Sequence, residues 1–189
     1  MGAMRTTPPQ ILASGRFLSL VKRGTWEYAT RATSPDVVAI VPITDDGRIL
    51  LVEQFRPPIG AKVIEIPAGL VGDHEHHVGE TAETAARREL LEETGHQAAS
   101  WSLLAAGPTS PGICDEVMSL FLATDLRRVG PAHGDGNEQI ELHEVHLRDL
   151  HPWLAGRAGG GTVIDIKIFS GLYLAARANP GLRAALYTP

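Results

Sequence analysis

The sequence predicts an α+β domain or a layered α/β/α domain, and three observations support this fold class. Short runs of β-branched and alternating apolar residues, separated by turn-forming residues, predict several strands before residue 67. A helical segment follows at residues 80–95, and further strand-like runs come after it. A longer helical pattern lies near the end of the chain. Strands on both sides of one central helix, with another helix at the end, are typical of layered domains.

The composition is that of one globular domain. The chain has 189 residues, of which 43% are hydrophobic and 21% are charged. Its formal net charge of -5 and its lack of a basic tract argue against a nucleic-acid-binding protein. It has no apolar run of membrane-spanning length and no signal-like N-terminal pattern, and the lone Cys114 suits a reducing compartment. We therefore expect a cytoplasmic protein without nucleic-acid or membrane partners.

The strands expected before the central helix all end at turn-forming residues. They are Phe17–Val21, Trp26–Arg31, Val37–Thr44, Ile49–Phe55 and Lys62–Ile66. Residues 22–25 join the first two as a hairpin, and Asp45-Asp46-Gly47 is a strong turn signal between the next pair. Residues 1–10, which include two consecutive prolines, are expected to be a mobile lead-in.

The central helix carries three carboxylates, Glu89, Glu92 and Glu93, within one turn. At about 100° per residue, Glu89 and Glu93 share a face with Ala82 and Ala86, the apolar stripe that should face the protein body. Acids in the last turn also lie at the negative end of the helix dipole. A solvated charged face is the ordinary alternative for a Glu-rich helix. Because the acids share the alanine face, we favour a bound cation instead.

The elements expected after the helix follow Gly95, which occupies the usual helix-ending position. Three strands and two helices are expected there: Trp101–Ala105, Val117–Thr124, Ile140–Leu147, Asp149–Leu154 and Ile164–Ala178. Asn179-Pro180 should stop the last helix, and residues 159–161, all glycine, should form a flexible connector.

In the central motif, Glu80 is followed after seven residues by Arg88-Glu89-Leu90-Leu91-Glu92-Glu93-Thr94-Gly95. This motif resembles the Nudix box, the signature of hydrolases that act on nucleoside diphosphates linked to another group, with the acids and the glycine in register. The family's glycine normally lies six residues before the first Glu, and that position is His74 here. Pro67-Ala68-Gly69 resembles the usual entry to the box, so the chain carries five extra residues within 72–78.

The flanking motifs are similar to those of the ADP-ribose and ADP-sugar pyrophosphatases. They are Thr25-Trp26-Glu27, Glu53-Gln54-Phe55-Arg56-Pro57-Pro58, Glu65-Ile66-Pro67-Ala68-Gly69-Leu70, and Ser110-Pro111-Gly112 followed by Glu116. This resemblance implies the Nudix fold, an α/β/α sandwich with a mixed sheet. It also implies a homodimer, in which residues 1–35 form an N-terminal extension that pairs two subunits and residues 36–189 form the hydrolase domain.

A pyrophosphate is multiply negative, so cations must neutralise its oxygens before water can attack phosphorus. Magnesium prefers hard oxygen ligands, which makes Glu89 and Glu93 the first-choice ligands, with Glu92 close behind. The resemblance adds the backbone carbonyl of Ala68, and Mn²⁺ is the expected substitute for Mg²⁺. Arg88 is expected to orient these acids. Glu80 lies on another helical face and is less favoured as a direct metal ligand. Its structural role would be to pair with Arg88 and hold the helix, and both roles remain open.

The general base is expected on a loop before a late strand, as the resemblance implies. Glu138 is the best candidate because it lies just before the apolar alternation begins. Glu141 would lie within the strand, and Asp135 is more simply a turn residue. All three acids could instead be solvated.

The expected substrate-binding residues are drawn mainly from the flanking motifs. In similar enzymes an aromatic residue at the position of Trp26 stacks on adenine, although Trp26 could also be a packed strand or interface residue. Phe17 is a weaker second candidate. Arg31 and Arg56 could hold phosphate or the terminal ribose through forked hydrogen bonds, and Glu116 could reach the site from a loop.

Two further features receive the simpler interpretation. His74, His76 and His77, with Glu75, are closely spaced in an apparent insertion and are interpreted as a solvated loop rather than a metal site. Cys114 is interpreted as a small packed thiol, since no motif links it to a base.

The sequence therefore predicts Mg²⁺-dependent hydrolysis of ADP-ribose or a related ADP-sugar into AMP and a sugar phosphate. The substrate is thus a small nucleoside diphosphate sugar. Two alternatives remain: hydrolysis of another nucleoside diphosphate sugar or a dinucleotide, and a module that senses a nucleotide without cleaving it.

Overall fold

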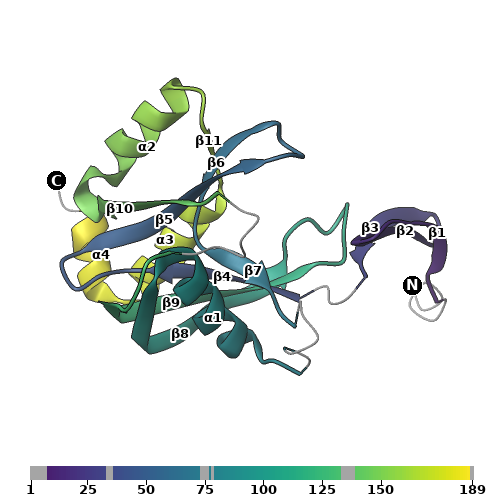
Figure 1. Ribbon diagram of the computed structural model, residues 1–189, viewed down its shortest axis with the longest axis horizontal. Helices are drawn as coiled ribbons and strands as arrows, with labels where there is room; N and C mark the ends of the chain where they lie inside the picture. The colour runs from purple at the N-terminus through teal and green to yellow at the C-terminus, as the bar shows by residue number, and fades with distance from the viewer. Residues whose placement is uncertain (1–7, 33–35, 73–76, 78, 133–138, 188–189) are drawn as a thin grey trace.

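The computed structural model describes residues 8–32, 36–72, 77, 79–132 and 139–187 (Figure 1). The strands are β1 (Gln10–Ser14), β2 (Leu18–Arg23), β3 (Trp26–Arg31), β4 (Asp36–Pro42), β5 (Arg48–Arg56), β6 (Ala61–Glu65), β7 (Ala68–Leu70), β8 (His96–Pro108), β9 (Val117–Arg128), β10 (Glu141–His146) and β11 (Val163–Ile164). The helices are α1 (Ala82–Thr94), the 3₁₀ turn η3 (Leu147–Asp149), α2 (Leu150–Gly159), α3 (Lys167–Ala178) and α4 (Pro180–Tyr187). None of the helices in these ranges is long and apolar enough to cross a membrane.

Two four-stranded mixed sheets form the body of the protein. One has the order β7-β4-β9-β8, in which β4 pairs parallel with β9 and antiparallel with β7. The other has the order β10-β5-β6-β11, in which only the β6–β11 pairing is parallel. The expected α+β fold with a mixed sheet is confirmed, and the mixed sheet is divided in two.

Strand β4 carries apolar side chains on both faces, so two cores meet at it. Ala39 and Val41 belong to the larger core, with residues from β5, β6, β9, β10, η3, α2 and α3. Val38 and Ile40, which point the other way, belong to the core beneath α1. Helix α1 therefore lies on one face of the first sheet, and α3 contributes to the core on the other face (Figure 1).

The N-terminal strands β1, β2 and β3 form a separate antiparallel sheet that stands apart from the body (Figure 1). It meets the body at residues 113–116, where the Ala29 N–H donates to the Ile113 carbonyl at 2.8 Å. Large apolar side chains of this sheet and its first loop are exposed: Ile11, Leu12, Phe17, Leu18, Leu20 and Trp26. The sheet therefore presents apolar surface that this chain does not cover within its described residues.

Several elements differ from the sequence prediction because long-range pairing overrides local patterns. Strand β1 pairs with β2 and begins at Gln10, the last residue of the expected mobile lead-in. Ile164 does not begin a helix, because it pairs with Ile64 as part of β11, and α3 begins only at Lys167. The strand expected at residues 101–105 is part of the much longer β8, which pairs with β9 along most of its length.

The helices near the C-terminus also extend beyond the prediction. Helix α2 continues through Gly159, so the first of the three glycines is helical and not a connector. Pro180 ends one helix but begins another, α4, as expected of proline at a first helical position. The Asn179 side-chain oxygen accepts the Gly181 N–H at 2.9 Å, which caps that start.

Candidate active site

The acid-bearing helix α1 is held in place at both ends. At its start, the Thr81 hydroxyl accepts the Thr84 N–H at 3.2 Å as an N-cap. At its end, Gly95 adopts a φ of 71°, and its N–H bonds to the Leu91 carbonyl at 2.8 Å. A Cβ at this glycine would also overlap the Gly130 carbonyl. The last turn, which carries the acids, is thereby fixed against the end of β9.

Glu89 and Glu93 lie on the buried face of α1 together with Ala86, as the sequence predicted. They are 8% and 5% exposed, respectively. The Glu93 carboxylate accepts the Ala68 N–H at 3.0 Å, which joins the helix to strand β7. The Glu92 side chain is 40% exposed and lies further out. Two carboxylates therefore lie beside the backbone at Ala68, where the resemblance places a metal-binding carbonyl.

Gly69 is the residue that lets the helix approach β7 this closely. A Cβ built at Gly69 would overlap the carboxylate of Glu89. Any other residue at this position would push the carboxylate away or displace the strand. A glycine at position 69 is therefore a steric requirement for this placement of the Glu89 carboxylate.

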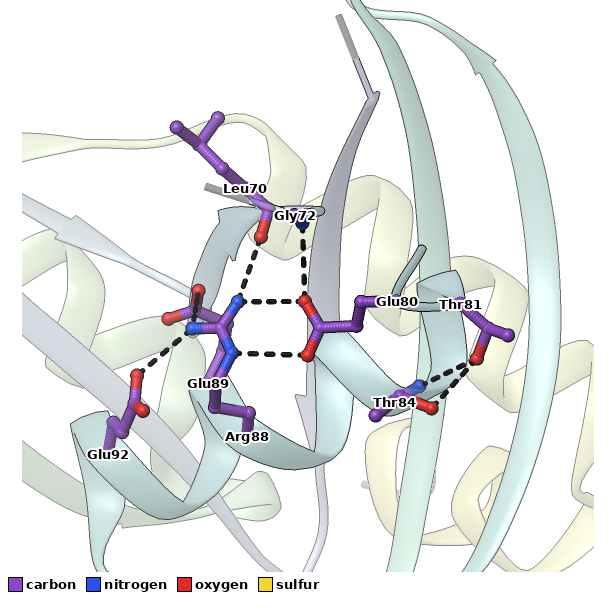
Figure 2. Close-up of polar contacts among 8 residues, drawn as sticks. All are labelled: Leu70, Gly72, Glu80, Thr81, Thr84, Arg88, Glu89 and Glu92. Atoms are coloured by element: carbon purple, nitrogen blue, oxygen red, sulfur yellow. Dashed lines mark hydrogen bonds and ion pairs between the residues drawn. The ribbon is translucent and has the colours of Figure 1, made fainter. Parts of the chain in front are cut away.

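Arg88 organises the acids around it (Figure 2). Its guanidinium pairs with Glu80 at 3.2 Å, with Glu89 at 2.7 Å and with Glu92 at 3.1 Å. It also donates to the Leu70 carbonyl at 3.0 Å. The side chain is 14% exposed, so these bonds form in a largely dehydrated setting. Arg88 therefore links the helix, its preceding loop and β7, and the expected Glu80–Arg88 pair is present.

Glu80 is a structural part of this network. Its side chain is 5% exposed, and it also accepts the Gly72 N–H at 3.2 Å (Figure 2). Burial raises the pKa of Glu80, but the hydrogen bonds from Arg88 and Gly72 and the Arg88 charge outweigh it, so its pKa lies below its ordinary value. Glu80 is therefore held as a carboxylate that fixes Arg88.

A hollow of about 390 Å³ beside this network contains three of the residues predicted to bind substrate, Arg31, Arg56 and Glu116. Ala68 and Gly69 line the same hollow. Arg31 and Glu116 form an ion pair at 2.8 Å, with side chains 33% and 19% exposed. The structure thus places these candidates next to the buried acids of α1.

Arg56 pairs with Glu65, a residue not singled out by the sequence analysis. The Arg56 Nε lies 2.6 Å from Glu65 Oε2. Burial raises the pKa of Glu65 above its ordinary value despite this arginine and nearby Lys167. Position alone could have suggested Glu65, because it ends β6 immediately before the Pro-Ala-Gly segment.

The two aromatic candidates lie elsewhere. Trp26 is 57% exposed and lines a second hollow of about 370 Å³, with Arg23, Tyr28, Pro108, Pro111, Gly112, Cys114 and Asp115. Phe17 is 68% exposed, with the Arg16 guanidinium 4.9 Å from its ring centroid. Neither aromatic lines the hollow that holds Arg31 and Arg56 within one chain.

Several sequence candidates cannot be placed. Glu138 and Asp135, two of the three candidate bases, lie outside the described residues, as do His74, Glu75 and His76. Cys114 is partly buried and lies 3.7 Å from the Ser110 carbonyl, as a packed thiol would.

The third candidate base, Glu141, belongs to a cluster that sequence reasoning missed. Glu53, Glu141 and His143 bring potential ligand atoms within 4.8 Å of one another. Glu53 is 3% exposed, and its carboxylate lies 2.9 Å from His143, 3.3 Å from Lys62 and 3.5 Å from Arg157. Burial raises the pKa of Glu53, but these partners together hold it below its ordinary value. The cluster is already compensated by two cations, which argues against a metal there.

The donor set of α1 fits a hard divalent cation better. Glu89 and Glu93 supply buried carboxylate oxygens beside the backbone of β7, and Glu92 supplies a more exposed one. Carboxylates and a carbonyl are the oxygen ligands that Mg²⁺ takes in proteins, usually together with water and substrate phosphate. Glu89 and Glu92 pair with the same guanidinium, that of Arg88, which also binds Glu80 before the helix. The residues present therefore fit the implied metal.

Known proteins share sequence similarity and the fold with this chain. The NUDIX domain matches residues 33–160. An ADP-ribose pyrophosphatase of Bacillus subtilis (strain 168) is 40% identical over 116 residues, which cover 61% of this chain and 60% of that protein. An ADP-sugar pyrophosphatase of Mus musculus is 37% identical over 164 residues, which cover 79% of this chain and 72% of that protein. A crystal structure of ADP compounds hydrolase shares the fold, with a TM-score of 0.65 and 22% identity over 93% of this chain and 96% of that chain.

Two of these findings decide the family. The NUDIX match covers more than half of the chain, and the mouse relative is matched over 72% of its own length. The chain spans 60% of the length of the Bacillus subtilis relative, so its likeness to that protein concerns that part. Family members as a class use divalent cations, in agreement with the acids gathered on α1. The chain belongs to the Nudix family.

Proposed function

We propose that this protein hydrolyses the pyrophosphate bond of ADP-ribose or a related ADP-sugar, giving AMP and a sugar phosphate. One observation carries the proposal: the buried carboxylates of Glu89 and Glu93 meet β7 at the edge of a hollow lined by Arg31 and Arg56. Acids that hold a cation, next to arginines that hold phosphate, form a site for a metal-bound diphosphate. The names of the relatives from Bacillus subtilis and Mus musculus support the ADP-sugar class.

Mg²⁺ is the proposed cofactor, with Mn²⁺ as its substitute, and Glu89, Glu93, Glu92 and the Ala68 carbonyl would hold it. When bound, the cation neutralises phosphate oxygens and acidifies a water molecule. Arg88 keeps the carboxylates oriented through its bonds to Glu89 and Glu92. No reorganisation of these acids is then required during the reaction.

Glu138 remains the proposed general base, and it would take the proton from the attacking water. Glu141 is the weaker alternative, because its carboxylate lies 3.7–3.9 Å from Lys62, His143 and Arg157. Arg31 and Arg56 would bind the diphosphate or the terminal ribose. Glu116 would hold Arg31 in place, as their ion pair suggests.

We propose a homodimer, formed through an N-terminal extension of residues 1–35, with residues 36–189 as the hydrolase domain. The exposed apolar side chains of the N-terminal sheet support a partner surface there. Trp26 and Phe17, which do not line the hollow of their own chain, would then stack on the adenine bound between subunits.

A nucleotide-sensing module is the competing function of another class. The presence of Glu89, Glu92 and Glu93 together on α1 disfavours it, because binding alone does not require metal-holding acids beside the diphosphate. Among enzymes, another nucleoside diphosphate sugar or a dinucleotide remains the alternative substrate, because the box determines the reaction more strictly than the leaving group.

The test is to incubate the purified protein with ADP-ribose and Mg²⁺ and to follow AMP release. The same assay on a panel of nucleoside diphosphate sugars and dinucleotides, compared as kcat/KM ratios, identifies the substrate class. We expect ADP-ribose or another ADP-sugar to give the highest ratio. Absence of turnover across the whole panel, with Mg²⁺ or Mn²⁺ present, would remove the enzyme interpretation.

A further inference from the structure

One wall of the hollow beside the carboxylates comes from the start of α3. Lys167, the first residue of that helix, lines the hollow together with Arg31, Arg56, Ala68 and Gly69. It lies far from the Nudix box in the sequence, and no motif used above includes it. Its side chain is 32% exposed, comparable to Arg31 and Arg56 at 33% and 35%. The hollow therefore has a third cation, from a different element.

Lys167 is held in position by a nearly buried acid. Asp165 accepts the Lys167 N–H at 2.8 Å through one carboxylate oxygen and pairs with the Lys167 ammonium through the other. Asp165 is 11% exposed, and its N–H donates to the Ile64 carbonyl at 3.0 Å, which ties it to β6. Within the described residues, Asp165 is the ammonium's only hydrogen-bond partner. An ammonium has three donors, so it has capacity to bind a further acceptor.

Basic hydrogen-bond donors from three elements meet at this hollow. Lys167 and Arg56 both act on the buried carboxylate of Glu65, one from α3 and the other from β5. Three basic side chains line the hollow, and each is held by one acid: Arg31 by Glu116, Arg56 by Glu65 and Lys167 by Asp165. The buried acids of α1 lie beside Ala68 and Gly69, at the edge of the same hollow. A bound diphosphate could thus have one end at the acids with their cation and another end at these basic side chains.

We propose that Lys167 is a substrate-binding residue. Of the two phosphates of the substrate, its ammonium donates, beside Arg56, to the one that is not held by the α1 acids and their metal. Asp165 is its positioning residue. The nature of the substrate rests on the proposed function above. Binding of a phosphate ester at Lys167 does not require turnover, so it is tested separately.

The kinetic experiment compares Lys167→Met and Lys167→Gln with Lys167→Arg in the full-length protein. Loss of one charge-assisted bond to phosphate should raise KM about tenfold, while kcat changes by less than about twofold, because the bond exists in both ground and transition states. Lys167→Arg should recover most of the loss. The matched control is Lys62→Met, which also removes a lysine charge beside a buried glutamate but whose carboxylate partners are Glu53 and Glu141. It should leave KM unchanged.

The binding experiment uses metal-free protein with AMP and ribose 5-phosphate as probes, measured by calorimetry. Lys167→Met and Lys167→Gln should weaken binding of at least one of these phosphate esters about tenfold, and the affected ester identifies the half of the substrate that Lys167 contacts. If affinity for both esters and KM are unchanged in whichever of the two variants folds normally, Lys167 is only structural and the inference is overturned.

The two proposals fail in distinguishable ways. A wild-type protein that cleaves nothing but binds a phosphate ester through Lys167 would sink the proposed activity and support this inference. If the wild-type protein cleaves ADP-ribose and Lys167→Gln has the same KM and the same ester affinity, the proposed activity is supported and this inference fails.

Discussion

The acids of α1 and the acids around Glu53 form two clusters of similar composition that differ in the number of cations beside the acids. Glu80, Glu89 and Glu92 share the single guanidinium of Arg88. Glu53 is instead surrounded by Lys62, Arg157 and His143, all within 3.5 Å. Buried acids that already have matching cations form a closed structural network, whereas acids in excess of their cations favour a metal. For a metal site, the proximity of potential ligand atoms is therefore a weaker criterion than the number of cations that the acids share.

The largest expected effect comes from removing one acid of the α1 cluster. Glu93→Gln should lower kcat for ADP-ribose by about 100-fold or more, because a metal ligand stabilises charge that develops in the transition state. Steady-state kinetics and chemical unfolding measured together check this, with Glu83→Gln as the control on an exposed face of the same helix. Equal activity in Glu93→Gln would exclude it as a metal ligand.

The second effect concerns Arg88, which holds the α1 cluster together. Arg88→Met leaves Glu80 and Glu89 without their buried guanidinium and should lower the free energy of unfolding by about 3 kcal/mol. Arg88→Lys keeps the charge but not the fork, so its loss should be smaller while kcat still falls. Urea denaturation measures the stability change. A fully active, fully stable Arg88→Met protein would show that the acids need no organiser.

A third, smaller effect should come from the Glu53 cluster. Glu53→Gln should lower the free energy of unfolding by about 1–3 kcal/mol, because Lys62 and Arg157 lose a buried charged acceptor. Activity per folded molecule, measured at saturating Mg²⁺, should stay within about twofold of wild type, since a cluster without metal contributes no binding site. A large loss of kcat with normal stability would instead assign a catalytic role to this second cluster.

The smallest effect is a dependence of the free energy of unfolding on pH. The pKa of Glu80 is depressed in the folded protein, so Glu80 contributes stability above its unfolded pKa of about 4.3 and loses it as pH falls through the folded value. Unfolding free energies measured from pH 7 downward should therefore fall less steeply below about pH 4.3 for Glu80→Gln than for wild type. Parallel curves would show that Glu80 titrates alike in the folded and unfolded chains.

The same contrast explains what sequence could and could not predict. The helical period placed Glu89 and Glu93 on the buried face with Ala86, and the box gave the Arg88 network, because both depend on local geometry. Lys167 was missed because the pairing of β11 with β6 brings it to the hollow, which leaves no local signal, whereas Glu65 stands in a quoted motif and was given no role of its own. The Glu53 cluster depends on the register of β10 with β5, which sequence does not specify.

The fold was predicted to a similar extent. Most strands and both principal helices were expected from alternation and turn residues. The division into two mixed sheets was not, because strand order depends on long-range contacts. Helix α2 ends later than predicted, because Gly159 can be helical when its neighbours complete the turn. Helix α3 begins later than predicted, because the β-branched residues Val163 and Ile164 pair with an available strand instead.

We predict that the metal binds the acids of α1 and not the acids around Glu53, which lie beside two cations. Titration of Mn²⁺ into the protein, followed by electron paramagnetic resonance of the free ion, tests this directly in the wild type and in Glu93→Gln and Glu53→Gln. We predict that Glu93→Gln weakens Mn²⁺ binding by at least about tenfold, whereas Glu53→Gln binds like wild type. Loss of binding in Glu53→Gln, with normal binding in Glu93→Gln, would contradict this assignment.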